Sequence, residues 1–170
     1  MLTYVMTEDR GATDRLLAGL AARLTREGVR LAGVVQHNVE CADDRLCDMD
    51  VAVLPDGPTF RISQSLGPEA RGCRLDPSAL EQAVAAVEAR WTVPDLLIVN
   101  KFGKHEAGGR GFRGPIARAL AEGVPVLTGV NRLNVGAFSD FAEGLAAPGP
   151  TEAEALHAHV TALLAREPAA

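Results

Sequence analysis

The chain has 170 residues, of which 47% are hydrophobic and 23% are charged, and its formal net charge is −5. This length is sufficient for one domain with a substantial core. The negative charge argues against a nucleic-acid binder, which usually carries a basic face, and no apolar stretch reaches the roughly 18 residues of a membrane span. We therefore expect a single cytoplasmic domain over residues 1–170, without nucleic acid and without membrane insertion.

The first part of the chain predicts a β-α-β unit. Leu2 to Met6 is typical of a strand, and a polar loop follows it. From Asp14 to Glu27 apolar residues recur at helical spacing until Gly28 ends the pattern. Leu31 to Val35 is a second apolar run, and polar residues 36–38 form its exit. This order of elements implies parallel strands joined by a right-handed crossover.

An alternating segment then interrupts the pattern. Residues 47–54 and 59–63 alternate between polar and apolar side chains, and Pro55-Asp56-Gly57-Pro58 lies between them. Alternation around such a turn predicts an antiparallel β-hairpin with one polar face. An irregular loop over residues 67–74 follows, and it contains Arg71 and Arg74.

The remaining sequence returns to alternating helices and strands. We predict a helix over 76–90, a strand over 96–100, a helix over 116–121, a strand over 125–130 and a terminal helix over 152–166. The strands are continuous apolar runs, which indicates burial on both faces, as in a parallel sheet covered by helices. The predicted class is a three-layer α/β fold with an inserted antiparallel hairpin, completed by a helical region over residues 133–170.

Polar residues gather where the predicted strands end. If the strands are parallel, these exits meet at one edge of the sheet, where ligands bind in open α/β folds. They are Thr7 to Gly11, Gln36 to Asn38, Asn100 to Lys104, and Asn131 to Asn134. The first helix directs its N-terminus at the same edge and offers unpaired N–H groups to an anion. The edge therefore predicts a phosphate or other oxyanion ligand.

Several stretches of the sequence resemble known families. Glu27 to Val35, Leu96 to Glu106 and Gly123 to Thr128 resemble the cancer-related nucleoside-triphosphatases, which are P-loop α/β proteins, and the match covers roughly residues 1–132. Arg61-Ile62-Ser63-Gln64 and Gly72-Cys73-Arg74-Leu75-Asp76 are similar to motifs of a bacterial family of unassigned function whose genes commonly lie near molybdate-uptake genes. The resemblance implies a P-loop-NTPase-like fold and a partner in the molybdenum pathway.

The sequence departs from the triphosphatases at the groups that perform hydrolysis. Residues 7–14 lack the first glycine and the lysine of the P-loop, keep only Gly11 and Thr13, and add Glu8, Asp9 and Asp14. Asn100-Lys101 replaces the Asp-Glu pair that follows the central strand in the relatives, although Mg²⁺ prefers carboxylate oxygens there. We therefore expect no catalytic residues.

The leading hypothesis is a non-hydrolytic accessory protein that binds a nucleotide or an oxyanion of the molybdate or tungstate type. The residues predicted to bind the ligand are Thr7, Gly11, Thr13, Arg71, Arg74, Asn100, Lys101, Lys104 and Asn131. The alternative is an active nucleoside-triphosphatase or phosphotransferase that uses a divergent loop. The sequence leaves homo-oligomerisation open.

The three cysteines are too few and too irregularly spaced for a disulfide framework. Five residues lie between Cys41 and Cys47, which is not a usual zinc spacing. Reduced structural thiols are the simplest interpretation. Cys73 is the alternative candidate for a metal ligand or a redox thiol, because it lies beside Arg74.

Overall fold

The structure, a computed structural model, describes residues 1–9, 11–38, 48–64 and 74–165. The described strands are β1 (Leu2–Val5), β2 (Leu31–Asn38), β3 (Met49–Val53), β4 (Thr59–Arg61), β5 (Leu96–Phe102), β6 (Val126–Val130) and β7 (Ala146–Pro148). The described helices are α1 (Ala12–Arg26), α2 (Pro77–Ala89), α3 (Lys104–Ala107), α4 (Arg113–Ala121), α5 (Val135–Ala142) and α6 (Ala153–Leu164). The strands form one sheet in the order β4-β3-β2-β5-β6-β1-β7.

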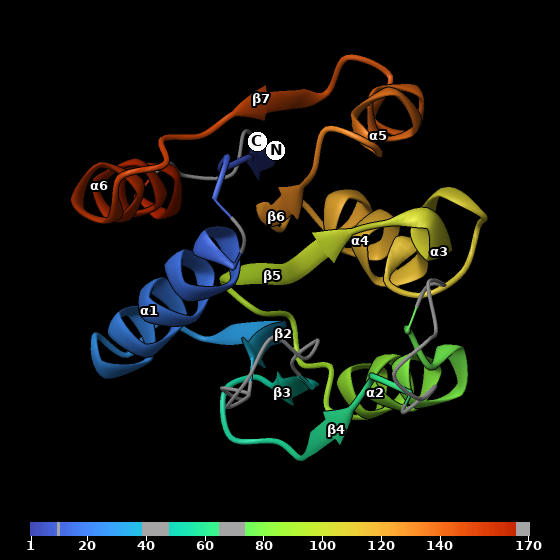
Figure 1. Cartoon of the computed structure of the whole chain (residues 1–170). Coiled ribbons are helices and arrows are strands. Elements are labelled where there is room, and N and C mark those ends of the chain that lie inside the picture. The colour runs from blue at the N-terminus through green and yellow to red at the C-terminus, as the bar shows by residue number, and fades with distance from the viewer. Residues whose placement is uncertain (10, 39–47, 65–73, 166–170) are drawn as a thin grey trace.

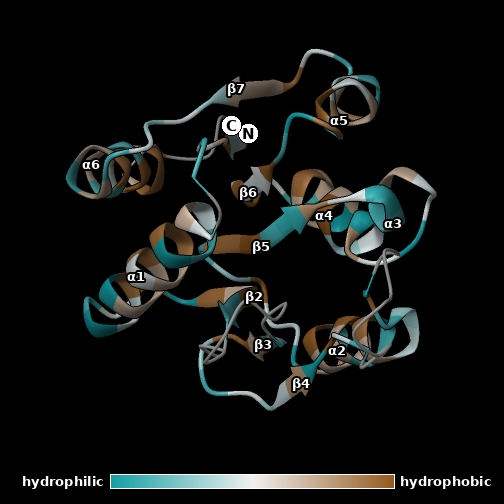
Figure 2. Cartoon of the chain, in the orientation of Figure 1, coloured by the Kyte–Doolittle hydropathy of each residue, from teal (hydrophilic) through white to brown (hydrophobic). Residues whose placement is uncertain are grey.

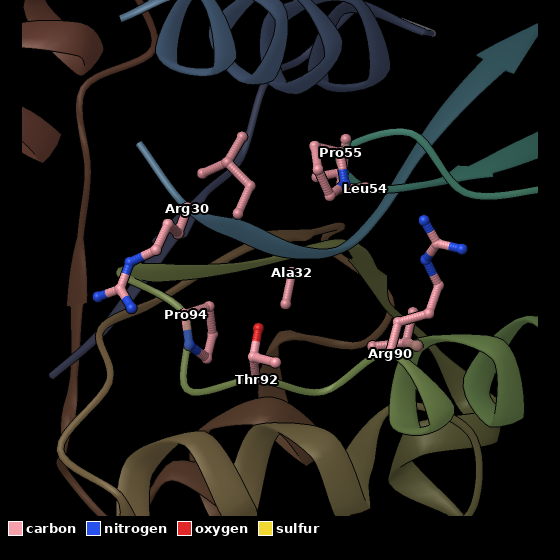
Figure 3. Close-up of a pocket in the computed structure, with 9 residues that line it drawn as sticks. Arg30, Ala32, Leu54, Pro55, Arg90, Thr92 and Pro94 are labelled. Atoms are coloured by element: carbon pink, nitrogen blue, oxygen red, sulfur yellow. The ribbon is translucent and has the colours of Figure 1, made fainter. Parts of the chain in front are cut away.

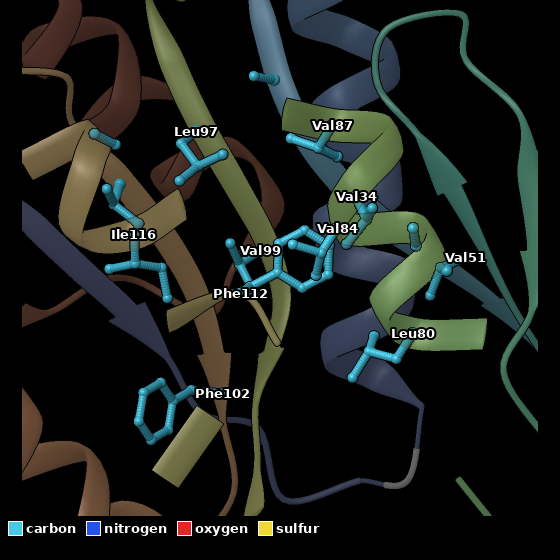
Figure 4. Packing of buried hydrophobic residues seen from close by; sticks show 14 of the residues in the cluster. Val34, Val51, Leu80, Val84, Val87, Leu97, Val99, Phe102, Phe112 and Ile116 are labelled. Atoms are coloured by element: carbon cyan, nitrogen blue, oxygen red, sulfur yellow. The ribbon is translucent and has the colours of Figure 1, made fainter. Parts of the chain in front are cut away.

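The sheet is the middle of three layers, as predicted. Helices α1 and α6 cover one face, and α2, α3, α4 and α5 lie on the other (Figure 1). The central strand β5 is buried on both sides: Leu96 and Ile98 pack in the cluster that includes α1 and α6, whereas Leu97 and Val99 pack in the cluster that includes α2 and α4 (Figure 4). Double-sided burial explains why its sequence is a continuous apolar run.

The predicted strand pairing is confirmed. Strands β2, β5, β6 and β1 are consecutive parallel neighbours, whereas β3 pairs with β2 and with β4 in antiparallel orientation. The backbones of β2 and β5 lie very close together at Gly33, because a Cβ atom there would lie 1.9 Å from the carbonyl oxygen of Ile98. Gly33 also has a φ of 103°, a value that L side chains rarely adopt. Only glycine therefore satisfies both the backbone conformation and the close strand contact.

Three details differ from the prediction. Residues 36–38 belong to β2 and are not a loop, because β3 continues the ladder as far as the pair of Asn38 and Met49. The region predicted to be helical after residue 133 contributes β7, which pairs in parallel with β1. A three-residue strand is too short for a periodic signal. Helix α3 also begins directly after β5, where no separate element was expected.

The starts of α1 and α2 are formed by different means. Asp76 caps α2, accepting hydrogen bonds from the backbone N–H groups of Ser78 and Ala79 at 2.9 and 3.1 Å. Gly11 precedes α1 with a φ of 74°, and no side chain caps that helix. Among the described residues, no helix has the combination of length and apolar character that crossing a bilayer requires.

Candidate functional site at the strand-exit edge

The carboxyl ends of β1, β2, β5 and β6 meet the start of α1, and we call this region the strand-exit edge. The backbone is closely packed there: a Cβ atom at Gly129 of β6 would lie 2.5 Å from the carbonyl oxygen of Asn100 and 2.7 Å from Cγ2 of Thr13. Figure 2 shows β5 changing from hydrophobic to hydrophilic toward this end. The first turn of α1 is thus placed directly against the exits of β5 and β6, as the sequence predicted.

Three side-chain amides surround the carboxylate of Asp14. Asn100 Nδ2 donates to Oδ1 at 2.8 Å, Asn38 Nδ2 donates to Oδ2 at 2.8 Å, and Gln36 Nε2 donates to Oδ2 at 3.4 Å. We call Gln36, Asn38 and Asn100 the amide cluster. Asn100 is only 3% exposed, and its Oδ1 also accepts the backbone N–H of Gln36 at 2.8 Å. The cluster therefore ties α1 to β2 and β5 through one negative charge.

The two threonines of the predicted loop contact each other. The hydroxyl oxygens of Thr7 and Thr13 are 2.7 Å apart, and either hydroxyl can donate. This contact joins the two ends of the segment that follows β1. In the P-loop motif that the sequence resembles, the hydroxyl at the position of Thr13 holds magnesium. Here the Thr13 hydroxyl is hydrogen-bonded to Thr7.

The predicted cations are distributed around the edge. Lys101 is exposed at the end of β5, next to Asn100. Lys104 is also exposed, but it begins α3, which lies across the sheet from α1 (Figure 1). Arg132 forms an ion pair with Glu8 at 2.7 Å, so one of the three acidic groups near the loop has a positive partner. Of the two predicted lysines, Lys101 is therefore the one on the strand that meets α1.

The other predicted ligand residues have structural contacts. Arg74 Nη2 lies 3.3 Å from Asp48 Oδ1, and its Nε donates to the Gln64 carbonyl oxygen at 3.1 Å. Asn131 Oδ1 accepts hydrogen bonds from the backbone N–H and side-chain amide of Asn134 at 3.0 and 2.9 Å, which fixes the start of α5. The remaining candidates, Arg71, Cys41, Cys47 and Cys73, lie outside the described residues.

Sequence reasoning did not find Arg15 or the amide cluster as a set. A Cβ atom at Gly11 would lie 3.3 Å from Arg15 Nη1 and 3.4 Å from Asn38 Nδ2, so both side chains reach the backbone of the loop. The sequence feature that could have indicated Arg15 is its position three residues after Ala12, the first residue of α1. A side chain there reaches back to the loop, because a helical side chain leans toward the helix N-terminus. Asp14 and Asn100 are 86 residues apart, and no local pattern links them.

A hollow lies at the opposite end of the strands, near the start of β2 (Figure 3). It has a volume of about 310 Å³ and an apolar floor that includes Ala32 and Leu54. The side chain of Arg30 points away from the hollow and binds Asp95, whose pKa it lowers mainly through their side-chain hydrogen bond. This hollow contains none of the predicted ligand-binding residues, and its two arginines have carboxylate partners.

The described residues contain no group of three or more His, Cys, Asp and Glu side chains arranged to hold a metal ion. Asp14 is held by amides, Glu8 is paired with Arg132, and Asn100 and Lys101 stand where the relatives carry carboxylates. Mg²⁺ prefers carboxylate oxygens and is repelled by an ammonium, and the one side-chain oxygen of Asn100 already accepts the Gln36 backbone N–H. The described side chains of this edge are amide donors, the exposed Lys101 and the hydrogen-bonded carboxylate of Asp14.

The fold defines a three-layer α/β protein with a mostly parallel sheet and an antiparallel hairpin at one border. Among solved structures, the chain is similar to the crystal structure of THEP1 from the hyperthermophile Aquifex aeolicus, with a TM-score of 0.70 and 17% sequence identity over 98% of this chain and 100% of that one. At this identity the similarity establishes the fold alone. The chain belongs to the family described as "Protein of unknown function (DUF2478)", which it matches over residues 2–159.

One curated relative shares much closer sequence similarity. Over 133 residues the chain is 40% identical to the "Molybdenum import ATP-binding protein ModC 2" of Bradyrhizobium diazoefficiens. The matched stretch covers 78% of this chain but only 15% of that protein. The relative therefore contains a segment similar to this chain within a much longer polypeptide.

Proposed function

We propose that this domain binds an anion or a nucleotide at the strand-exit edge without hydrolysing it, as an accessory domain in molybdenum handling. The observation that supports binding is the position of α1, whose first turn meets the exits of β5 and β6 beside the exposed Lys101. Backbone N–H groups at a helix start and a nearby ammonium both attract anions.

Two replacements support binding without turnover. Ala12 stands where the P-loop lysine would contact phosphates, and Asn100 stands where a carboxylate would hold magnesium. Asn100 donates to Asp14, so its side chain already has a structural role. Phosphoryl transfer depends mainly on positioned charges, and their loss removes most of its rate enhancement.

The molybdenum assignment is supported by the relative. That protein is named for molybdenum import, and its polypeptide contains a segment that is 40% identical to this chain. Domains that occur in one polypeptide often act in one process, so we propose a molybdenum-pathway protein as the partner and molybdate, tungstate or a nucleotide as the ligand.

A thermal-shift screen with molybdate, tungstate, sulfate, ATP and GTP, each with and without magnesium, tests the proposal. We expect at least one anion to raise the melting temperature without a requirement for magnesium. Lys101→Ala should weaken the binding of that anion about ten- to a hundredfold, since a charge-assisted hydrogen bond contributes about 1.5–3 kcal/mol. Lys104→Ala tests whether the second predicted lysine contributes, and Arg26→Ala, an exposed arginine near the far end of α1, is the control. The proposal fails if no anion raises the melting temperature.

A further inference from the structure

Arg15 provides a positive charge at the loop that the sequence comparison with P-loop proteins does not reveal. Its Nη1 lies 3.3 Å from the position of a Cβ atom at Gly11. Arg15 is exposed and forms no ion pair with any described residue, in contrast to Arg23 on the same helix, which binds Glu154 at 2.8 Å. It also lines one end of a groove of about 560 Å³ between α1 and α6, so its guanidinium is open to solvent.

Asn38 adds a neutral donor at the same point. Its Nδ2 lies 3.4 Å from the same Cβ position and donates to Asp14 at 2.8 Å. An amide nitrogen carries two hydrogens, and Asp14 accepts only one of them. One guanidinium nitrogen and one amide nitrogen therefore lie beside the loop and come from two different elements, α1 and β2.

The negative charge of Asp14 limits what these donors can bind. Its carboxylate has a fixed position because three amides donate to it. A nucleoside triphosphate brings several negative charges, which relatives balance with a lysine and Mg²⁺. Here the lysine is replaced by Ala12, and Asp14 repels further negative charge. A compact oxyanion needs only one planar fork and one additional donor.

We infer that Arg15 and Asn38 bind a small tetrahedral oxyanion of low charge over Gly11, and that Asp14 excludes nucleoside triphosphates from this position. This inference rests on the proposed function of the strand-exit edge and deepens it: the ligand class is the oxyanion, and Arg15 is its main charged contact. Lys101, at the end of β5, then adds a second positive charge that attracts the oxyanion.

Isothermal titration calorimetry with molybdate, tungstate, sulfate and ATP, on the whole chain, tests the inference. We expect a dianion to bind and ATP not to bind. Arg15→Ala should weaken dianion binding about ten- to a hundredfold, whereas the control Arg26→Ala, an exposed arginine near the other end of α1, should bind as the unsubstituted protein does. Asp14→Asn should gain measurable ATP binding. Unchanged melting temperatures would show that Arg15→Ala and Arg26→Ala remain folded.

Three results would overturn the inference. If Arg15→Ala binds dianions normally while Lys101→Ala loses them, the edge binds anions but Arg15 is not the contact. If ATP binds as tightly as the dianions, Asp14 does not select against nucleotides. If neither dianions nor ATP bind, the proposed function fails together with the inference.

Discussion

Asn100 donates a hydrogen bond of 2.8 Å from its side-chain amide to Asp14 Oδ1, and this contact joins the end of β5 to the first turn of α1. Both partners of this contact are protein groups. The edge therefore has an internal link between α1 and the sheet that requires no ligand.

Removing the carboxylate should therefore destabilise the fold. Asp14→Ala leaves the three donors of the amide cluster without their acceptor, and we expect a loss of about 1–3 kcal/mol in the free energy of unfolding. Urea denaturation measures this loss. Asp9→Ala is the control, because Asp9 is exposed and its side chain forms no hydrogen bond with any described residue. Equal stability of the two variants would contradict a structural role for Asp14.

The protein should not hydrolyse nucleotides in the presence of magnesium. Ala12, Asn100 and Lys101 replace the lysine and the two carboxylates that position phosphates and metal. Phosphate release from ATP and GTP, measured with magnesium and with a chelator, should equal that of a protein-free control. Turnover that a chelator abolishes would favour the alternative, a triphosphatase that uses a divergent loop.

The contact between Arg30 and Asp95 should make stability depend on pH. Asp95 accepts the Arg30 backbone N–H at 2.8 Å and binds the guanidinium, and the pKa of Asp95 is lowered mainly by the side-chain hydrogen bond. A lowered carboxyl pKa stabilises the folded state above the unfolded pKa of about 3.9, and this contribution is lost as the pH falls through the folded-state pKa.

Asp95→Asn should accordingly reduce the free energy of unfolding near neutral pH, by about 1 kcal/mol or less because the pair is partly exposed. The difference from the unsubstituted protein should shrink as the pH falls below about 4. Urea denaturation at several pH values measures it, with the exposed Asp140→Asn as the control. A difference that grows in acid would contradict the assignment.

Gly33→Ala should be strongly destabilising, since the new Cβ atom would lie 1.9 Å from the Ile98 carbonyl oxygen and the φ of 103° adds strain. We expect a loss of about 3 kcal/mol or more, or failure to fold. Gly19→Ala is the matched control: it lies within α1, nothing is within 4 Å of its added Cβ, and it should gain about 0.5–1 kcal/mol. Thermal melting compares the two variants, and similar melting temperatures would count against the close strand contact.

Much of the fold could be predicted because its strands are buried on both faces. Residues 96–99 are a continuous apolar run and residues 125–130 are mostly apolar, and the intervening helix indicated that the two strands are parallel. The exception is β7, whose residues Ala146 to Pro148 have no strand pattern and are held by pairing with β1. Such an edge strand depends on a tertiary neighbour that a local pattern does not reveal.

The site was predictable as a location but not as a set of contacts. Polar exits on parallel strands indicated that Thr7, Thr13 and Asn100 lie at the same edge of the sheet, as the structure shows, whereas ligand binding at this edge stays a prediction. The sequence did not indicate that Asn100 binds Asp14, because that contact depends on the crossing of α1 over β5. The same limitation applies to Arg15, whose direction is set by its side-chain conformation on the first turn of α1.

Within the described residues, the sheet ends on each side in a strand of only three residues, β4 and β7. Pro148 in β7 has no N–H group to donate, and Arg61 in β4 places a charge on the other border. Short, charged or proline-containing borders prevent an incoming strand from another molecule from extending the ladder. Among the described residues, both borders of the sheet are therefore poorly suited to pair with a further strand, which disfavours growth of the sheet from one molecule to another.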